Sequence, residues 1–383
     1  MLPMNVSKHI VPGLLLFALT VVPVAYAQQV LPLWPHGTPE PAQTTDPEKD
    51  VTKDSDALIN GHRTSRITNV TNPTMTVYQP TAEKNTHTAA LVFPGGGYVR
   101  LAWTGEGTDT CDWLTSVGIT CLLVKYRVPE QGHYPANYAD LEDAQQAMRL
   151  ARAHAGDWNV DPTHIGVIGF SAGANLAVLL STHPDDTHVE STPAVRDIPR
   201  ITHESSGAIT VSGKPDARPN FAIIVYPAYL VAEDQTVMDP VYAPNQFTPP
   251  TFLIQAENDK TYHRNAPIYF QALAAANVPA ELHMYSTGGH GFGIHPPGMP
   301  EEHWTRLADA WLRGLGMLPP FNPQNFQQIA LPSRTPTPAT SVPCPNPQAV
   351  PTMPSSNRPG GHPNGPINQG SSSTLNPTDQ PCP

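Results

Sequence analysis

The chain has 383 residues and a formal net charge of −11, with lysines and arginines scattered along it. A chain of this length can form one large domain with a full core, or two smaller ones. The acidic balance argues against a nucleic-acid partner, because no basic stripe is present to neutralise phosphates.

Residues 1–27 have the pattern of a secretory signal peptide. Lys8 precedes an apolar run from residue 11 to residue 24, and Ala25-Tyr26-Ala27 forms a small-x-small cleavage pattern. A membrane anchor is the alternative, but the run is short for a spanning helix and contains two prolines and a glycine. We expect cleavage after this segment, a periplasmic or secreted protein, and no integral membrane segment afterwards.

Apolar runs and amphipathic stretches alternate over the next part of the chain. Strands are expected at residues 74–78, 89–93, 119–126, 165–168, 221–226, 251–256 and 280–285, and those at 119–126, 165–168, 221–226 and 251–256 are expected to be buried. Helices are expected at residues 105–117, 135–155, 174–180, 263–276 and 303–315. Strands that alternate with helices form parallel β-α units. We therefore predict an α/β fold with a mostly parallel, twisted sheet flanked by helices.

Two segments lie outside this alternation. Residues 183–220 are polar, and we expect an excursion there, with a small hairpin at 208–211. From about residue 319 the chain consists mainly of Pro, Ser, Asn, Thr and Gln, which cannot bury enough apolar surface to offset the entropy of ordering. We predict a catalytic domain at 28–318 and a disordered tail at 319–383, with a partner-binding arm as the alternative for the tail.

The clearest functional motif lies at residues 164–181. The strand at 165–168 leads into Gly169-Phe170-Ser171-Ala172-Gly173, and an apolar helix follows. This is the order of a nucleophile elbow, in which a strained turn lifts a serine hydroxyl out of the sheet. The flanking glycines allow helix and strand to approach closely. We predict that Ser171 is a nucleophile, with a plain Gly/Ser turn as the alternative.

A serine hydroxyl needs a base within hydrogen-bond reach. His290 lies in a glycine-rich loop after the last predicted strand, and we predict that it is this base. Asp259 follows the preceding predicted strand and would fix the tautomer of the histidine. The rivals of Asp259 are Glu257, Asp234 and Asp239, and a solvated helix cap is its alternative role.

A triple glycine follows the strand predicted at 89–93. The backbone N–H groups of Gly96 and Gly97, together with that of Ala172, would converge on a developing oxyanion. A phosphate loop is excluded because no Gly-Lys-Ser/Thr follows the glycines. A plain glycine turn is the remaining alternative.

We expect neither a metal nor another cofactor. The sequence contains no cysteine pair or close histidine pair with the spacing of metal ligands, and no G-x-G-x-x-G after a strand. His295 shares the loop of the predicted base and is interpreted as part of a pocket wall. We predict that His295 and Tyr98 contact the substrate.

Four cysteines in an oxidising compartment allow three disulfide pairings. The least demanding arrangement joins Cys111 to Cys121 and Cys344 to Cys382. Free buried thiols are the alternative, because pairing depends on a Cα separation that the sequence does not give.

With these residues placed, the chain resembles the α/β-hydrolase superfamily and, more narrowly, secreted bacterial esterases related to acetyl xylan esterases and feruloyl esterases. The resemblance spans about residues 31–315 and rests on LPLWPHGTP, VFPGGGYVRLAWTGEG, VKYRVPE with YPANYADLEDAQQAMRLAR, IGVIGFSAGANLA and PAELHMYSTGGHGFG. It implies the same nucleophile, base, orienting acid and oxyanion amides. Lipase-like relatives usually carry a histidine before the glycines, whereas Pro94 stands here, as in the acetyl-xylan-esterase-like group.

The resemblance implies a serine carboxylesterase that hydrolyses short acyl esters, with acetyl groups on xylan or a related carbohydrate as the expected substrate. A peptidase of the prolyl-oligopeptidase type is one alternative, although that group usually adds an N-terminal propeller that we do not find in this sequence. A non-catalytic binding or scaffold protein is the other alternative, and the intact Ser-Asp-His set argues against it. The sequence gives no oligomeric state.

Overall fold

The computed structural model describes residues 28–40, 43–56, 58, 61–130, 137–185, 210–211, 214–231, 236–294 and 298–321. All of them belong to one unit, Met1–Asn322. The signal peptide predicted at residues 1–27 and residues 322–383 of the predicted tail lie outside the described residues.

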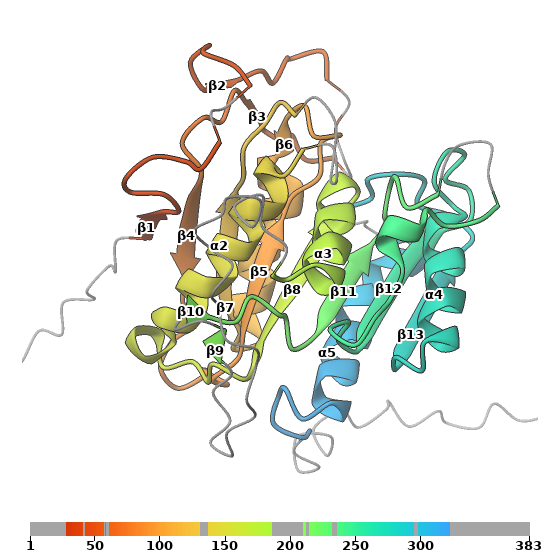
Figure 1. The fold of residues 1–383 in the computed structure, drawn as a ribbon. Helices are drawn as coiled ribbons and strands as arrows, with labels where there is room; N and C mark the ends of the chain where they lie inside the picture. Colours follow the sequence, from red (N-terminus) through yellow and green to blue (C-terminus); the bar gives the residue numbers. More distant parts are fainter. Residues whose placement is uncertain are drawn as a thin grey trace, which may run out of the picture. The chain divides into compact units, whose positions relative to one another are not determined.

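The described residues form a central eight-stranded sheet in the order β1-β4-β7-β5-β8-β11-β12-β13 (Figure 1). Its strands are β1 (Gln29–Pro32), β4 (Thr74–Tyr78), β5 (Ala89–Phe93), β7 (Thr120–Lys125), β8 (Ile165–Phe170), β11 (Ala222–Val225), β12 (Thr251–Ala256) and β13 (Ala280–Tyr285). The neighbours from β7 to β13 are parallel, and β4 runs antiparallel between β1 and β7. The predicted mostly parallel sheet is confirmed.

Helices cover both faces of this sheet. The α-helices are α1 (Asp109–Ser116), α2 (Ala139–Ala153), α3 (Ala172–Thr182), α4 (Asn265–Ala275) and α5 (Trp304–Gly314). Leu91 and Phe93 of β5 share a core with α2, α3 and α4, whereas Ala90 and Val92 share one with α1 and α5. Because side chains alternate along a strand, a strand covered on both faces consists almost entirely of apolar residues.

Several elements differ from the prediction. The expected helix at 105–117 begins as a π-helix, η1 (Trp103–Thr108), and continues as α1. The hairpin expected at 208–211 lies later in the chain and consists of β9 (Thr210–Val211) and β10 (Lys214–Pro215). The prediction did not include β1, the small sheet of β2 (Lys49–Asp50), β3 (Arg66–Thr68) and β6 (Leu101–Ala102), or the 3₁₀ helices η2 (Ala155–Trp158), η5 (Pro240–Tyr242) and η6 (Pro300–His303). These elements are too short to produce a hydrophobic period.

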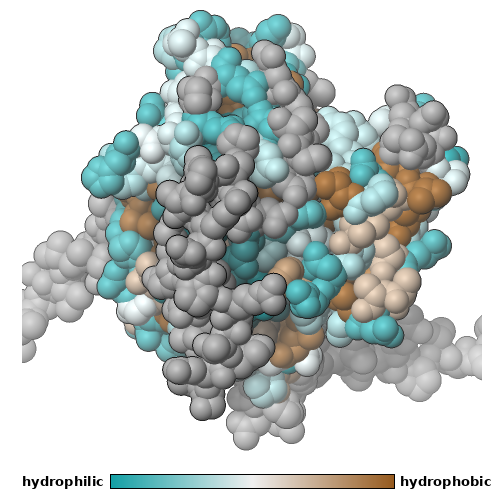
Figure 2. All heavy atoms as spheres, in the orientation of Figure 1, coloured by the Kyte–Doolittle hydropathy of each residue, from teal (hydrophilic) through white to brown (hydrophobic). Residues whose placement is uncertain are grey.

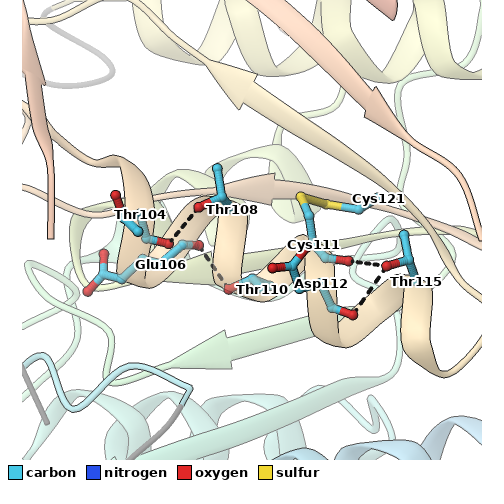
Figure 3. Close-up of a disulfide and its surroundings, with 8 residues drawn as sticks. All are labelled: Thr104, Glu106, Thr108, Thr110, Cys111, Asp112, Thr115 and Cys121. Carbon is cyan, nitrogen blue, oxygen red and sulfur yellow. Dashed lines mark hydrogen bonds between the residues drawn. A yellow bond between two sulfur atoms is a disulfide. The ribbon is translucent and has the colours of Figure 1, made fainter. Parts of the chain in front are cut away.

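Cys111 of α1 and Cys121 of β7 form a disulfide, with their Cα atoms 5.1 Å apart (Figure 3). This is the pairing proposed from the sequence for these two residues, and it joins α1 covalently to the sheet. Cys344 and Cys382 lie outside the described residues.

The surface is unevenly polar on the side shown in Figure 2, where hydrophobic colour gathers over the part in which Figure 1 draws α4. The sequence of α4, NAPIYFQALAA, contains no charged residue. None of the described helices is long and apolar enough to span a membrane.

A buried ionic cluster joins the end of β7 to the first turns of α2. The Nε of Arg127 donates to both carboxylate oxygens of Asp143, at 3.1 and 3.0 Å, and its Nη2 reaches Glu142 at 3.3 Å. Asp140 lies beside this cluster and is fully buried, and its Oδ2 has no hydrogen-bond partner among the described residues. Burial raises the pKa of Asp140 to about 7.

Asp140→Asn is expected to weaken the pH dependence of stability. Between pH 3.8 and about 7 the folded chain holds a proton on Asp140 that the unfolded chain has lost, so stability falls as the pH rises through this interval. The unchanged protein should therefore lose stability between pH 5 and pH 8, and the variant should not. The difference in free energy of unfolding between variant and unchanged protein should be at least about 1 kcal/mol more favourable to the variant at pH 8 than at pH 5. Urea unfolding at both pH values measures the change, with Asp239→Asn at an exposed position as control. Parallel pH profiles for Asp140→Asn and the unchanged protein would contradict this prediction.

Candidate active site

Ser171 lies at the turn between β8 and α3, in a strained backbone conformation with φ 53° and ψ −116°. Close packing on both sides of the turn imposes this conformation. A Cβ atom on Gly169 would overlap the carbonyl oxygen of Gly173, and one on Gly173 would overlap the carbonyl oxygen of Phe93. The predicted elbow geometry is therefore present, and the serine side chain stands at the carboxyl end of β8.

The structure brings together three side chains that are far apart in the sequence. The Oγ of Ser171 lies 2.7 Å from Nε2 of His290, and Nδ1 of the same ring lies 2.7 Å from Oδ2 of Asp259. A proton on Nδ1 would donate to the carboxylate and leave Nε2 free to accept from the serine hydroxyl. This arrangement has the hydrogen-bond pattern of a Ser-His-Asp triad.

Asp259 is held by its own loop. Its Oδ1 accepts the backbone N–H groups of Thr261, at 3.1 Å, and Tyr262, at 3.0 Å, while the Nε2 of Gln255 donates to Oδ2 at 3.1 Å. Burial opposes the charge on Asp259, but the hydrogen bonds from His290, Tyr262 and Thr261 outweigh it and hold its pKa below the ordinary value. The carboxylate is thus ionised at neutral pH and oriented toward the imidazole.

The rivals of Asp259 are not in this position. Glu257 is exposed. Asp239 is also exposed, and its side chain accepts the N–H of Val241 as the N-cap of η5. Asp234 lies outside the described residues. Of the described candidates, Asp259 is the one hydrogen-bonded to His290.

The loop that carries His290 is shaped by glycines on either side of it. Gly289 and Gly291 have φ values of 64° and 81°, in the left-handed region that favours glycine. Asn258 accepts the N–H of Gly289 at 2.8 Å and so ties this loop to the loop of Asp259. The ring of Tyr262 packs 4.8 Å from the imidazole, centroid to centroid. The histidine is therefore held in place while its side chain keeps some exposure.

The glycine segment after β5 lies directly against the elbow. A Cβ atom on Gly95 would lie 2.8 Å from the Cβ of Ser171, closer than real Cβ atoms approach. Gly96 and Gly97 follow with positive φ, and Ala172 is the first residue of α3, where a backbone N–H has no acceptor within its own helix. These positions are compatible with the predicted oxyanion hole, whose role stays a prediction.

Of the two residues predicted to contact substrate, the structure describes one, Tyr98. Tyr98 is fully buried, and its hydroxyl donates to Oδ1 of Asn175 at 2.8 Å. Its ring stacks on that of Tyr229, with centroids 6.2 Å apart. Tyr98 thus supports the glycine segment from the interior, and its contact with substrate stays a prediction. His295 lies outside the described residues.

Sequence reasoning missed Glu106 and three tyrosines around the site. Tyr226 and Tyr229 have positive φ values of 37° and 61°. Tyr98 and Ser171 also have positive φ, and such strain in non-glycine residues clusters at functional sites. Tyr226 and Tyr229 follow the carboxyl end of β11, next to that of β8, and this place along the chain could have identified them. Tyr262 and Glu106 carried no comparable signal.

The described residues contain no group of three or more His, Cys, Asp or Glu side chains arranged to hold a metal ion. The site brings together a hydroxyl, an imidazole, a carboxylate and backbone amides. Together these groups can carry out nucleophilic attack with proton transfer.

Gly173→Ala is expected to destabilise the protein, because the added methyl group would overlap the carbonyl oxygen of Phe93 and push α3 away from β5. Overpacking of this kind costs about 1–3 kcal/mol in free energy of unfolding. Gly156→Ala is a matched control, since Gly156 also lies in a helical turn and nothing lies within 4 Å of its added Cβ. Thermal and urea unfolding measure both variants, and equal stabilities would contradict the packing argument.

The chain is similar to several known proteins. Residues 90–294 match the model of a family described as having the alpha/beta hydrolase fold. The acetylxylan esterase of Xylanibacter ruminicola is 29% identical over 235 residues, which cover 60% of this chain and 44% of that protein. The carboxylesterase NlhH of Mycobacterium tuberculosis is 26% identical over 249 residues, which cover 60% of this chain and 74% of that protein.

Among solved structures, the acetyl ester-xyloside bifunctional hydrolase of Caldicellulosiruptor lactoaceticus has a TM-score of 0.54 and 27% sequence identity, and the match covers 76% of this chain and 97% of that one. The matched region covers less than half of the Xylanibacter ruminicola esterase. The family match spans more than half of this chain and confirms the resemblance inferred from the sequence. The chain belongs to the alpha/beta-hydrolase fold family.

Proposed function

We propose that the protein is a serine carboxylesterase that hydrolyses short acyl esters. The observation that carries this proposal is the continuous hydrogen-bond path from Asp259 through His290 to Ser171, with both contacts at 2.7 Å. A hydroxyl becomes a competent nucleophile when a base held by a third group is within reach of it. The similarity to named carboxylesterases and acetyl esterases supports the same reaction class.

The reaction would proceed in two acyl transfers. Ser171 attacks the ester carbonyl while His290 takes its proton, and the N–H groups of Gly96, Gly97 and Ala172 stabilise the oxyanion that forms. His290 then returns the proton to the departing alcohol, which leaves an acyl group on the serine. In the second transfer a water molecule, deprotonated by the same imidazole, releases the acid and restores the hydroxyl. Asp259 stays ionised throughout and stabilises the imidazolium.

The substrate we propose is an acetyl ester on xylan or a related carbohydrate. Two similar proteins carry names that refer to acetylxylan and to acetyl ester and xyloside hydrolysis, and this supports the proposal. The signal-peptide pattern of residues 1–27 supports a periplasmic or secreted location, where such a polymer would be accessible. Hydrolysis rates over a p-nitrophenyl ester series, measured beside acetate release from acetylated xylan, test the substrate. Fast turnover of long acyl chains with no acetate release from xylan would rule it out.

Ser171→Ala is expected to lower kcat for p-nitrophenyl acetate by roughly 10⁶-fold, as loss of the nucleophile does in subtilisin. The same variant should lose labelling by a fluorophosphonate probe, which reports an activated serine directly. Ser116→Ala is the control, because Ser116 is an exposed serine at the end of α1. Near-normal hydrolysis by Ser171→Ala would show that the nucleophile is wrongly assigned. If the unchanged protein is labelled at its serine but does not hydrolyse esters, a peptidase is favoured.

Asp259→Asn is expected to lower kcat by about 10⁴-fold, because an amide in place of the carboxylate favours the wrong imidazole tautomer. KM should change little, since the amide has nearly the same shape, whereas the thermal unfolding temperature should fall modestly because the ionised form loses its charged hydrogen bonds. Asp309→Asn is the control: it weakens the ion pair with Arg313 on α5 without touching the site. If Asp259→Asn keeps kcat within about tenfold of the unchanged protein, the orienting role fails.

A further inference from the structure

Glu106 is a buried carboxylate between two loops of the site. It lies in the π-helix η1 and is 5% exposed. Its Oε2 accepts the backbone N–H of Gly95 at 2.6 Å, and its Oε1 accepts the hydroxyl of Tyr226 at 2.9 Å. Among the described residues no lysine or arginine forms an ion pair with Glu106. Both of its oxygens are hydrogen-bonded to residues of the site loops.

Tyr226 extends this connection to the loop of the histidine. Its hydroxyl accepts the backbone N–H of Gly293 at 3.2 Å, and its ring lies 4.6 Å from that of Phe292 and 5.4 Å from the imidazole of His290, centroid to centroid. One hydrogen-bonded path therefore runs from Gly95, at the start of the glycine segment, through Glu106 and Tyr226 to the histidine loop.

We propose that Glu106 is a positioning residue that fixes the oxyanion segment relative to the loop of His290. This inference rests on the proposed serine-esterase mechanism, which needs the oxyanion amides and the imidazole at a set separation from Ser171. Glu106 acts through Gly95 and Tyr226, because it is buried and both of its oxygens are already engaged.

An ionised carboxylate suits this place for a chemical reason. It has only acceptor positions, so it can accept an N–H from one side and an O–H from the other, and hydrogen bonds to a charged acceptor are the shorter and stronger ones. Burial has the largest effect and raises the pKa of Glu106 above its ordinary value, while the hydrogen bonds from Gly95 and Tyr226 and the nearby His290 act in the opposite direction and favour the charged form. A glutamine would keep the shape but would turn an NH₂ group toward one of the two donors.

The backbone that carries Glu106 is itself well anchored. The hydroxyl of Thr110 donates to the carbonyl oxygen of Glu106 at 3.0 Å. The same helical segment continues to Cys111, which is bonded to Cys121 of β7 (Figure 3). π-Helical turns are rare and are found frequently at functional sites. The carboxylate can therefore act as a fixed reference point for the two loops.

The test compares Glu106→Gln, Tyr226→Phe and the double variant in the full chain, with p-nitrophenyl acetate as substrate. Glu106→Gln is expected to lower kcat by about 10- to 100-fold, the effect of a small displacement of catalytic groups, while KM changes less than about threefold. Tyr226→Phe should lower kcat by about 5- to 20-fold. Because both residues belong to one path, the double variant should lose little more than Glu106→Gln alone.

Glu142→Gln is the matched control. Glu142 is also a buried glutamate, 3% exposed, but its partner is Arg127 and it lies on α2, outside the predicted site. It should keep kcat, although its unfolding temperature can fall as much as that of Glu106→Gln. If Glu106→Gln and Glu142→Gln both lose kcat in proportion to the fall in their unfolding temperatures, the role of Glu106 is purely structural and the proposal is overturned.

The remaining outcomes also decide. If Glu106→Gln does not fold, Tyr226→Phe carries the test: a loss of kcat smaller than about fivefold overturns the proposal, and a loss of about fivefold or more at constant KM supports it. Additive losses in the double variant would show that the two residues act separately, which also overturns it. If Ser171→Ala abolishes hydrolysis while both other variants keep kcat, the proposed function stands and the role of Glu106 fails. If Ser171→Ala keeps hydrolysis, the proposed function itself is wrong.

Discussion

The site depends on the close packing of α3 against β5 and β8. Gly169 and Gly173 bring helix and strand backbones into contact, and Ser171 between them has a strained conformation with positive φ. Packing contacts over the whole length of α3 stabilise this turn, because every residue of the helix is buried. The strain is thus supported by a large part of the core, and the serine hydroxyl is directed out of the sheet as a consequence.

Polar groups at the carboxyl end of the sheet are held in place by hydrogen bonds from neighbouring residues. Asp259 receives hydrogen bonds from its own loop, the histidine loop is tied to that of Asp259 by Asn258, and Glu106 connects the glycine segment to Tyr226. A buried polar group is costly unless its hydrogen bonds are satisfied, so such a network specifies one arrangement of the loops. Preorganised donors and acceptors of this kind need little reorganisation during a reaction.

The parallel sheet and its helices could be predicted, because central strands such as β5, β7 and β11 are apolar runs and helices such as α2 and α5 have an amphipathic period. The triad residues could be assigned from their places after β8, β12 and β13 in chain order. Short elements such as β2 and β6 escaped prediction because two residues cannot show a period. Glu106 escaped because its importance lies in a contact with Tyr226, 120 positions away, which no local pattern records, whereas Tyr226 could have been identified from its place after β11.

The excursion between α3 and β11 is attached at the opposite end of the sheet. α3 starts beside Ser171 and runs back against the strands, and Asn220, just before β11, donates its backbone N–H to the carbonyl of Ile165 at the start of β8. Both described ends of this insertion are therefore remote from the carboxyl edge. Substitutions at these two ends are therefore expected to leave the arrangement of Ser171, His290 and Asp259 unchanged.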